Sequence, residues 1–205
     1  MKKPKIRELR EAIRSLFSSP FTTEFPFKPH VPARKFRGKP EYNSDTCVGC
    51  GACFHVCPAR AIEMVDSSAE GKGTRTLIHH PKDCLFCGEC ERNCITDNGI
   101  KLSGVFDVSY FDEKDVQSRV EHNLLVCKHC GEIIGAEKHV LWTLRKLGSL
   151  AFSQPVMLSS LMEEMEFKTE AEENVVAPIQ RTDALKVICP KCRRIAFISD
   201  EKKER

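Results

Sequence analysis

The stretch Thr46–Met64 reads TCVGCGACFHVCPARAIEM, and a second stretch, Asp83–Leu102, reads DCLFCGECERNCITDNGIKL. Their first cysteines, Cys47 and Cys84, lie 37 residues apart, and each stretch ends in a short apolar segment. The sequence therefore contains an internal duplication. Such a duplication predicts a pseudo-symmetric unit with two equivalent sites.

The cysteine spacing in the two stretches indicates what the sites bind. The first stretch has the run C-x2-C-x2-C-x3-C-P, which in bacterial ferredoxins holds iron–sulfur clusters. Three cysteines of such a run wrap one cubane, and the fourth ligates the other cluster. We therefore expect two 4Fe–4S clusters with crossed ligands: Cys47, Cys50, Cys53 and Cys94 for the first, and Cys84, Cys87, Cys90 and Cys57 for the second.

The residues around these runs qualify this expectation in two ways. Ile95, and not proline, follows Cys94, but ligation by Cys94 is still expected because the thiolate binds the iron. Three histidines, His55, His79 and His80, lie near the runs. A histidine beside a cluster could couple electron transfer to protonation. A surface or packed role is the more common one, and it is the expected one here.

Four further cysteines form two pairs, Cys127-Lys-His-Cys130 and Cys189-Pro-Lys-Cys192. Together they supply the four thiolates of a closed, tetrahedral zinc site, which is structural and not catalytic. The intervening residues 131–188 make a long insertion, but its closure costs only about 3–4 kcal/mol. Structural zinc contributes about 10–16 kcal/mol in small peptides. We expect a zinc-ribbon-like site; mononuclear iron, a further cluster and unligated thiols remain alternatives.

Composition restricts the remaining possibilities. The chain has 205 residues, 12 cysteines and a net charge of +3, and no stretch approaches the roughly 20 apolar residues of a membrane span. Cysteines in C-x-x-C groups without a secretory signal favour metal binding in the cytoplasm over disulfides. Nucleic acid binding is not expected, because basic residues near the C-terminal pairs are few and no aromatic platform accompanies them. No catalytic site is visible, since nucleophile–base pairs and phosphate loops are missing.

The chain divides into three predicted segments with an α+β fold. Residues 1–40 form a basic docking arm with 11 Lys and Arg against 3 Asp and Glu, and residues 6–17 have the periodicity of an amphipathic helix. Residues 41–104 form the dicluster ferredoxin domain, and residues 105–205 form an extension. We expect strands at Ala61–Val65, Thr74–Ile78, Ile100–Leu102 and Val105–Tyr110, and helices at Asp112–Leu125, Glu132–Leu147 and Val156–Glu173.

The arm residues Ser15–Pro20, Phe25–Phe27 and Phe36–Pro40, followed by the duplicated cysteine runs, resemble the ferredoxin-like subunit of respiratory complex I and its hydrogenase relatives. With the two C-terminal cysteine pairs, the chain is most similar to the iron–sulfur subunit of formate-hydrogenlyase-type, group 4 membrane-bound nickel–iron hydrogenases. The insertion 131–188 is longer than expected for that branch.

This resemblance implies an electron-transfer subunit without a catalytic site of its own. Its partners would be a small iron–sulfur subunit, a nickel–iron large subunit, a membrane subunit and an electron-input subunit. The complex would lie on the cytoplasmic face of the cell membrane, with peripheral contact through partners or the N-terminal helix. Two alternatives are the dicluster subunit of an NADH:quinone oxidoreductase and a free-standing ferredoxin.

Overall fold

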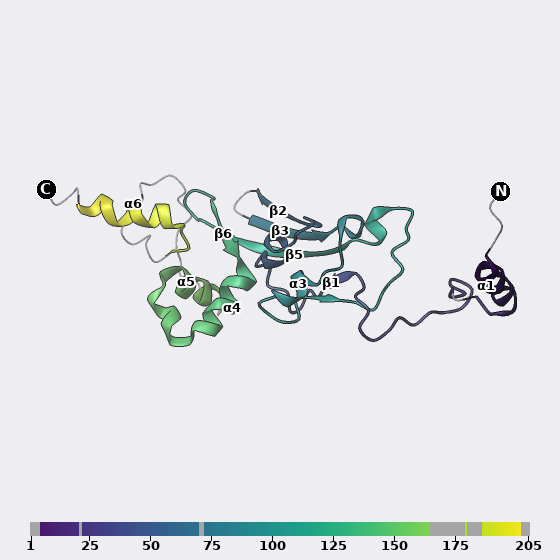
Figure 1. Ribbon diagram of the computed structural model, residues 1–205. Coiled ribbons are helices and arrows are strands. Elements are labelled where there is room, and N and C mark those ends of the chain that lie inside the picture. Colours follow the sequence, from purple (N-terminus) through teal and green to yellow (C-terminus); the bar gives the residue numbers. More distant parts are fainter. Residues whose placement is uncertain (1–4, 21, 70–71, 165–178, 180–185, 202–205) are drawn as a thin grey trace. The chain divides into compact units, whose positions relative to one another are not determined.

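The computed structural model describes residues 5–20, 22–69, 72–164, 179 and 186–201 (Figure 1). The chain forms two units that divide between Phe36 and Arg37. The first unit contains α1 (Ile6–Phe17), and the second contains every other helix and strand.

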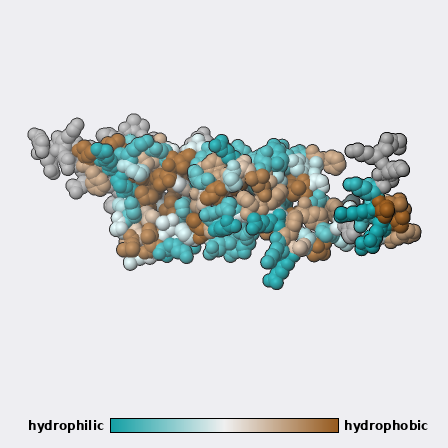
Figure 2. All heavy atoms as spheres, in the orientation of Figure 1, coloured by the Kyte–Doolittle hydropathy of each residue, from teal (hydrophilic) through white to brown (hydrophobic). Residues whose placement is uncertain are grey.

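The helix α1 is exposed along its whole length. It begins after Lys5, whose backbone N–H donates to the Glu8 carboxylate, and ends before Ser18, as the sequence predicts. Its apolar residues share one side, and Figure 2 shows brown and teal atoms on different sides of this helix. The side chains on the apolar side are largely exposed: Ile6, Leu9, Ile13, Leu16 and Phe17. Among the described residues of this unit, none covers the apolar side of the amphipathic helix.

The second unit begins where the chain joins a two-stranded sheet. Strand β1 (Pro40–Tyr42) pairs antiparallel with β4 (Ile100–Leu102). Immediately before β1, the backbone at Gly38 lies so close to the chain after β4 that an added Cβ would meet the Ser103 carbonyl oxygen at 2.2 Å. This close approach requires glycine, so Gly38 of the FRGKP stretch packs its backbone directly against the chain that follows β4.

A four-stranded antiparallel sheet forms the second layer. Its strands are ordered β2 (Ile62–Ala69), β3 (Lys72–His79), β5 (Ser118–Val126) and β6 (Ile133–Ala136). Leu77 of β3 pairs with Val120 of β5, and both are buried toward the cysteine runs. One core therefore combines apolar residues of the strands with three cysteines of the two runs. Its members are Cys47, Cys53, Ile62, Leu77, Cys90, Ile100 and Val120.

The duplicated stretches have matching backbone conformations. Three pairs of residues spaced 37 positions apart have a positive φ: Gly49 (68°) and Phe86 (51°), Gly51 (77°) and Gly88 (80°), and Arg60 (53°) and Asp97 (61°). Gly51 and Gly88 each precede a one-turn helix, α2 (Ala52–His55) and α3 (Glu89–Arg92). The two cysteine runs therefore follow the same backbone path.

The remaining elements lie in short connections and in the C-terminal part. Three 3₁₀ helices span Pro81–Asp83 (η1), Glu113–Asp115 (η2) and Gly148–Ser153 (η3). The C-terminal α-helices are α4 (Glu137–Leu147), α5 (Pro155–Glu164) and α6 (Pro190–Glu201). A second small core surrounds the C-terminal cysteines Cys127, Cys189 and Cys192 together with Ile188.

The expected strands of the dicluster segment are confirmed, whereas after it two expectations are wrong and a third is confirmed in part. Val105–Tyr110 forms no strand; the Asp107 carboxylate accepts a hydrogen bond from the Ser109 backbone, and such local bonds compete with sheet pairing. Asp112–Leu125 is not a helix, because it contains η2 and most of β5. Glu132–Leu147 is a helix only from Glu137 onward.

Two expectations reach beyond the described residues. The helix expected at Val156–Glu173 corresponds to α5 as far as Glu164, and the rest lies outside the described residues. The predicted segment boundary after residue 104 stays a prediction; β5 of the extension pairs with β3 of the dicluster segment. Within the described residues, no helix has both the length and the apolar character that a membrane span requires.

Candidate metal centres

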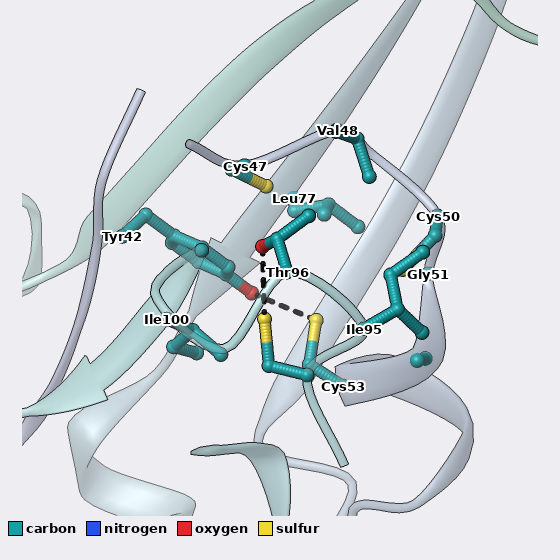
Figure 3. A pocket seen from close by; sticks show the side chains of 13 residues that line it. Tyr42, Cys47, Val48, Cys50, Gly51, Cys53, Leu77, Ile95, Thr96 and Ile100 are labelled. Atoms are coloured by element: carbon teal, nitrogen blue, oxygen red, sulfur yellow. Dashed lines mark hydrogen bonds between the residues drawn. The ribbon is translucent and has the colours of Figure 1, made fainter. Parts of the chain in front are cut away.

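The first predicted ligand set lines one pocket. Cys47, Cys50, Cys53 and Cys94 line this pocket together with apolar side chains that include Leu77. Cys47 and Cys50 come from the loop that leads into α2, Cys53 lies in α2 itself, and Cys94 comes from the loop that follows α3. Figure 3 shows this pocket with thiol groups turned toward its interior. The structure thus brings together cysteines from both halves of the duplication.

The second predicted set lines a corresponding pocket. Cys84, Cys87 and Cys90 belong to the second run, and Cys57 is contributed by the first. His79, one of the histidines singled out in the sequence, lines the same pocket. The two pockets have the exchange of fourth cysteines that the spacing predicts, and the ligands themselves remain predictions.

The chemistry of the thiols fits a positively charged occupant. Burial raises the pKa of Cys53 to about 11 and that of Cys90 to about 12, against the ordinary value of 9.0. Thiolates at these positions are therefore costly unless a cation lies beside them. Iron ions supply that charge and bind thiolates directly. The donor set consequently suits iron–sulfur clusters.

Side chains outside the cysteine runs reach the sulfurs of the first pocket. The Tyr42 hydroxyl lies 3.6 Å from the Cys53 Sγ, and the Thr96 hydroxyl lies 3.4 Å from the Cys94 Sγ (Figure 3). The third contact is made by the His122 ring, whose Nε2 is 3.3 Å from the Cys47 Sγ. Sequence reasoning missed all three contacts. Tyr42 and His122 lie 11 and 75 positions from their cysteines, but Thr96 lies two positions after Cys94, and this proximity was the available signal.

Both cluster loops are tied to neighbouring parts of the fold by arginine. Arg75 on β3 forms a bidentate ion pair with Asp66 on β2, with both N–O distances at 2.7 Å, and donates to the Gly49 carbonyl at 3.0 Å. The hydrogen bond from Arg75 lowers the pKa of Asp66. Arg37 of the FRGKP stretch donates to the Cys87 carbonyl at 2.9 Å. Charged side chains thus hold the loops of both runs from outside.

The four C-terminal cysteines also come together, although 58 residues separate Cys130 from Cys189. The sulfurs of Cys127, Cys130, Cys189 and Cys192 all lie within 4.8 Å of one another. The Lys128 backbone N–H donates to the Val187 carbonyl at 3.0 Å, which joins the two cysteine pairs directly. Gly131, with φ of 72°, closes the first turn by donating to the Cys127 carbonyl.

The spacing of these sulfurs suits one metal ion. Zinc–sulfur bonds of about 2.3 Å in a tetrahedron place sulfurs roughly 3.8 Å apart. The observed distance between the Cys130 and Cys189 Sγ atoms is 3.6 Å. A cubane would separate its thiolates further, because four irons and four sulfides lie between them.

Burial raises the pKa of Cys127, but backbone amides of Cys130, Cys189 and His129 donate to it and bring the value down to about 7.

Comparison with known proteins identifies the two cysteine runs as part of an iron–sulfur domain. A family model described as a 4Fe-4S dicluster domain matches residues 27–98. Formate hydrogenlyase subunit 6 of Escherichia coli is 31% identical over 127 residues, which cover 62% of this chain and 68% of that protein. NADH-quinone oxidoreductase subunit I 2 of Geobacter metallireducens is 29% identical over 119 residues, covering 55% of this chain and 89% of that protein.

Among solved structures, one similar chain comes from the membrane-bound sulfane sulfur reductase, an archaeal respiratory membrane complex. It is 24% identical with a TM-score of 0.37, and the match covers 56% of this chain and 60% of that one.

Proposed function

This chain belongs to the family of dicluster iron–sulfur proteins that includes formate hydrogenlyase subunit 6 and subunit I of NADH-quinone oxidoreductases, and we propose that it relays electrons within a membrane-associated hydrogenase complex. The observation that carries this proposal is the pair of four-cysteine pockets. The two pockets adjoin one core, which contains Cys53 from the first and Cys90 from the second. Two redox centres built on one core suit a relay.

The proposed ligands are the two crossed sets. Cys47, Cys50, Cys53 and Cys94 would hold one 4Fe–4S cluster, and Cys84, Cys87, Cys90 and Cys57 would hold the other. When bound, each cluster supplies a one-electron redox centre. The chain would hold the thiolates on short loops and on the one-turn helices α2 and α3. Ile62, Leu77, Ile100 and Val120 would cover them and thereby limit the access of water.

The C-terminal cysteines are proposed to hold a structural zinc ion. Four thiolates within 4.8 Å of one another suit a closed tetrahedral site, which leaves no position for substrate. Such a site would join β5 and β6 to the start of α6, because its ligands come from both ends of the insertion 131–188. Its role is to fix the C-terminal part, and not to transfer electrons.

The arm is proposed to dock on the membrane part of the complex. The apolar side of α1 is exposed, with Leu16 at 79% and Phe17 at 87% of full exposure, and basic residues accompany it. Such a helix can lie against a membrane subunit or at the lipid interface. The proposed partners are a nickel–iron large subunit, a small iron–sulfur subunit, a membrane subunit and an electron-input subunit, on the cytoplasmic face.

Purification of the tagged chain from anaerobically prepared membranes tests this proposal. We expect a nickel–iron large subunit to copurify, because the C-terminal cysteine pairs resemble those of the hydrogenase branch. Recovery with a flavin-containing NADH-oxidising module would assign the chain to a complex I-type assembly instead. Recovery of the chain alone, with full electron-shuttling activity in solution, would show a free-standing ferredoxin.

A further inference from the structure

We propose that two buried histidines of the four-stranded sheet, His122 and His79, each donate a hydrogen bond into one of the two cluster sites and raise the reduction potential of the cluster held there. This inference rests on the proposed dicluster function. It goes further by assigning the two sites a pair of tuning residues that lie outside the cysteine runs.

His122 reaches the first site from β5. Its side chain is 3% exposed, and its Nε2 lies 3.3 Å from the Cys47 Sγ. A thiolate that ligates iron carries negative charge and accepts hydrogen bonds, so this contact is favourable when Nε2 carries the proton. Among the described residues, Nδ1 has no hydrogen-bond partner. The contact to Cys47 is consequently the polar interaction that the structure gives this ring.

The loop makes room for this ring through Gly49. A Cβ at position 49 would lie 2.7 Å from the His122 Cδ2, closer than real Cβ atoms approach. The equivalent position in the second run is Phe86, which has the same sign of φ but carries a large side chain. Left-handed backbone alone therefore does not demand glycine in this fold. The glycine at position 49 is required because the His122 ring packs against it.

His79 occupies a corresponding place at the second site. It is 1% exposed and lines the pocket of Cys57, Cys84, Cys87 and Cys90. Neither of its ring nitrogens has a partner among the described residues. A neutral imidazole carries one N–H group, and leaving that donor buried and unpaired is costly. No cysteine sulfur of the described residues lies within hydrogen-bond distance of either nitrogen, so the sulfides of a cluster bound in this pocket would supply the acceptor.

The sheet register explains why each site receives one histidine. On β3 and β5, Leu77 pairs with Val120, and His79 pairs with Ser118. His122 pairs with Arg75, four residues before His79 on β3. Since side chains two and four residues apart face the same side of a sheet, His79 and His122 lie at opposite ends of one face, with Leu77 and Val120 between them. The face thus offers a donor at each end and apolar cover in the middle.

The direction of the effect follows from charge. Reduction adds one negative charge to a cluster, and a hydrogen-bond donor stabilises the more negative form more strongly. Hydrogen bonds to the sulfurs are among the factors that set the potentials of iron–sulfur centres. Each histidine should therefore raise the potential of its own cluster.

An EPR-monitored redox titration of the full-length protein with both clusters loaded tests the inference. We expect His122→Leu to shift one of the two reduction steps to lower potential and His79→Leu to shift the other. The expected shift is about tenfold in the reduction equilibrium, which is about 59 mV for a one-electron couple. His122→Gln, which retains an N–H group near the position of Nε2, should restore most of the wild-type potential.

The matched control is His55→Leu. His55 lies between Cys53 and Cys57 in the sequence but is exposed, so this variant should leave both steps unchanged. Unchanged potentials in the two loaded leucine variants would overturn the inference, as would an equal shift in His122→Gln and His122→Leu. A chain that binds no clusters would instead overturn the proposed function.

A second measurement serves if a leucine variant loses its clusters. Wild-type protein carrying ¹⁵N only in its histidine rings can be reduced and examined by pulsed EPR. Weak ¹⁵N coupling to the reduced clusters is expected from donors that lie against cluster sulfurs. The absence of any ¹⁵N coupling would overturn the inference without requiring a variant.

Discussion

The Nε2 atom of His122 lies 3.3 Å from the Sγ atom of Cys47, although the two residues are 75 positions apart in the chain. The contact joins β5, which follows the duplicated segment, to the first cysteine of the first run. The strand that carries His122 therefore contacts the sulfur of a cysteine that lines the first pocket, and it is not a separate appendage.

The packing of His122 on Gly49 predicts a costly substitution. Gly49→Ala places a Cβ against the ring and forces alanine to adopt a φ of 68°. We expect a loss of about 1–3 kcal/mol in unfolding free energy. Gly104→Ala is the control, because a Cβ there meets nothing within 4 Å. Anaerobic guanidinium unfolding measures both variants, and equal midpoints would contradict the predicted contact.

The ion pair of Arg75 with Asp66 predicts that replacing Arg75 destabilises the protein more than replacing Arg119 on the neighbouring strand. Arg75→Met removes a bidentate pair and the hydrogen bond to Gly49, all from a side chain that is 13% exposed. We expect a loss of about 1–3 kcal/mol. Arg119→Met breaks an exposed pair with Glu121 and should cost about 0–1 kcal/mol. Thermal loss of visible cluster absorbance ranks the two variants, and a reversed order would refute the prediction.

Crossed ligation predicts which cysteine variants resemble each other. Cys94→Ser should alter the same EPR signal as Cys47→Ser, although the two positions belong to different runs. Cys57→Ser should in turn alter the same signal as Cys84→Ser. If Cys94→Ser altered the same EPR signal as Cys84→Ser, each cysteine run would ligate its own cluster, and crossed ligation would be contradicted.

His80 predicts a pH dependence of stability. Burial lowers its pKa, but hydrogen bonds to Glu113 at 2.9 Å and Glu63 at 3.1 Å outweigh burial, so the pKa is raised above 6.5. Hydrogen bonds from Lys82 and His80 lower the pKa of Glu113 to about 2. Because the pKa of His80 is raised, its protonated form stabilises the folded state. This stabilisation is fully present below pH 6.5 and is lost as the pH rises through the pKa of His80 in the folded protein.

The lowered Glu113 pKa acts at the other end of the scale, since its stabilisation is present above pH 4.5 and is lost as the pH falls toward 2. Wild-type protein should therefore exceed His80→Gln in thermal stability most clearly between pH 4.5 and 6.5. The difference should shrink at higher pH. A difference that grows above pH 8 would contradict the predicted sign.

The sequence predicted the two cysteine pockets because their determinants are local. Spacing within each run fixes which thiols face inward, and the duplication implies a second, equivalent site. The C-terminal cysteine pairs were also expected to converge, and they do so across the insertion 131–188. In these cases, residue type and spacing alone carry the information.

The sheet around the pockets was not predictable in the same way. Val120 and Leu124 are four residues apart, a spacing that suits a helix as well as one face of a strand. Between them lies His122, which reads as polar in a sequence but is buried against Cys47. The histidine thus concealed the alternation of β5, and the segment was expected to be a helix. The contact between His122 and Cys47 depends on the pairing of β3 with β5, which no local sequence pattern encodes.

Metal analysis combined with EPR on anaerobically prepared, full-length protein tests the central claim most directly. Two crossed clusters and one tetrathiolate ion predict about eight irons and one zinc per chain, with two reducible 4Fe–4S signals. About nine irons without zinc would place mononuclear iron at the C-terminal cysteines. About four irons, or none, would contradict the account of two clusters on one core.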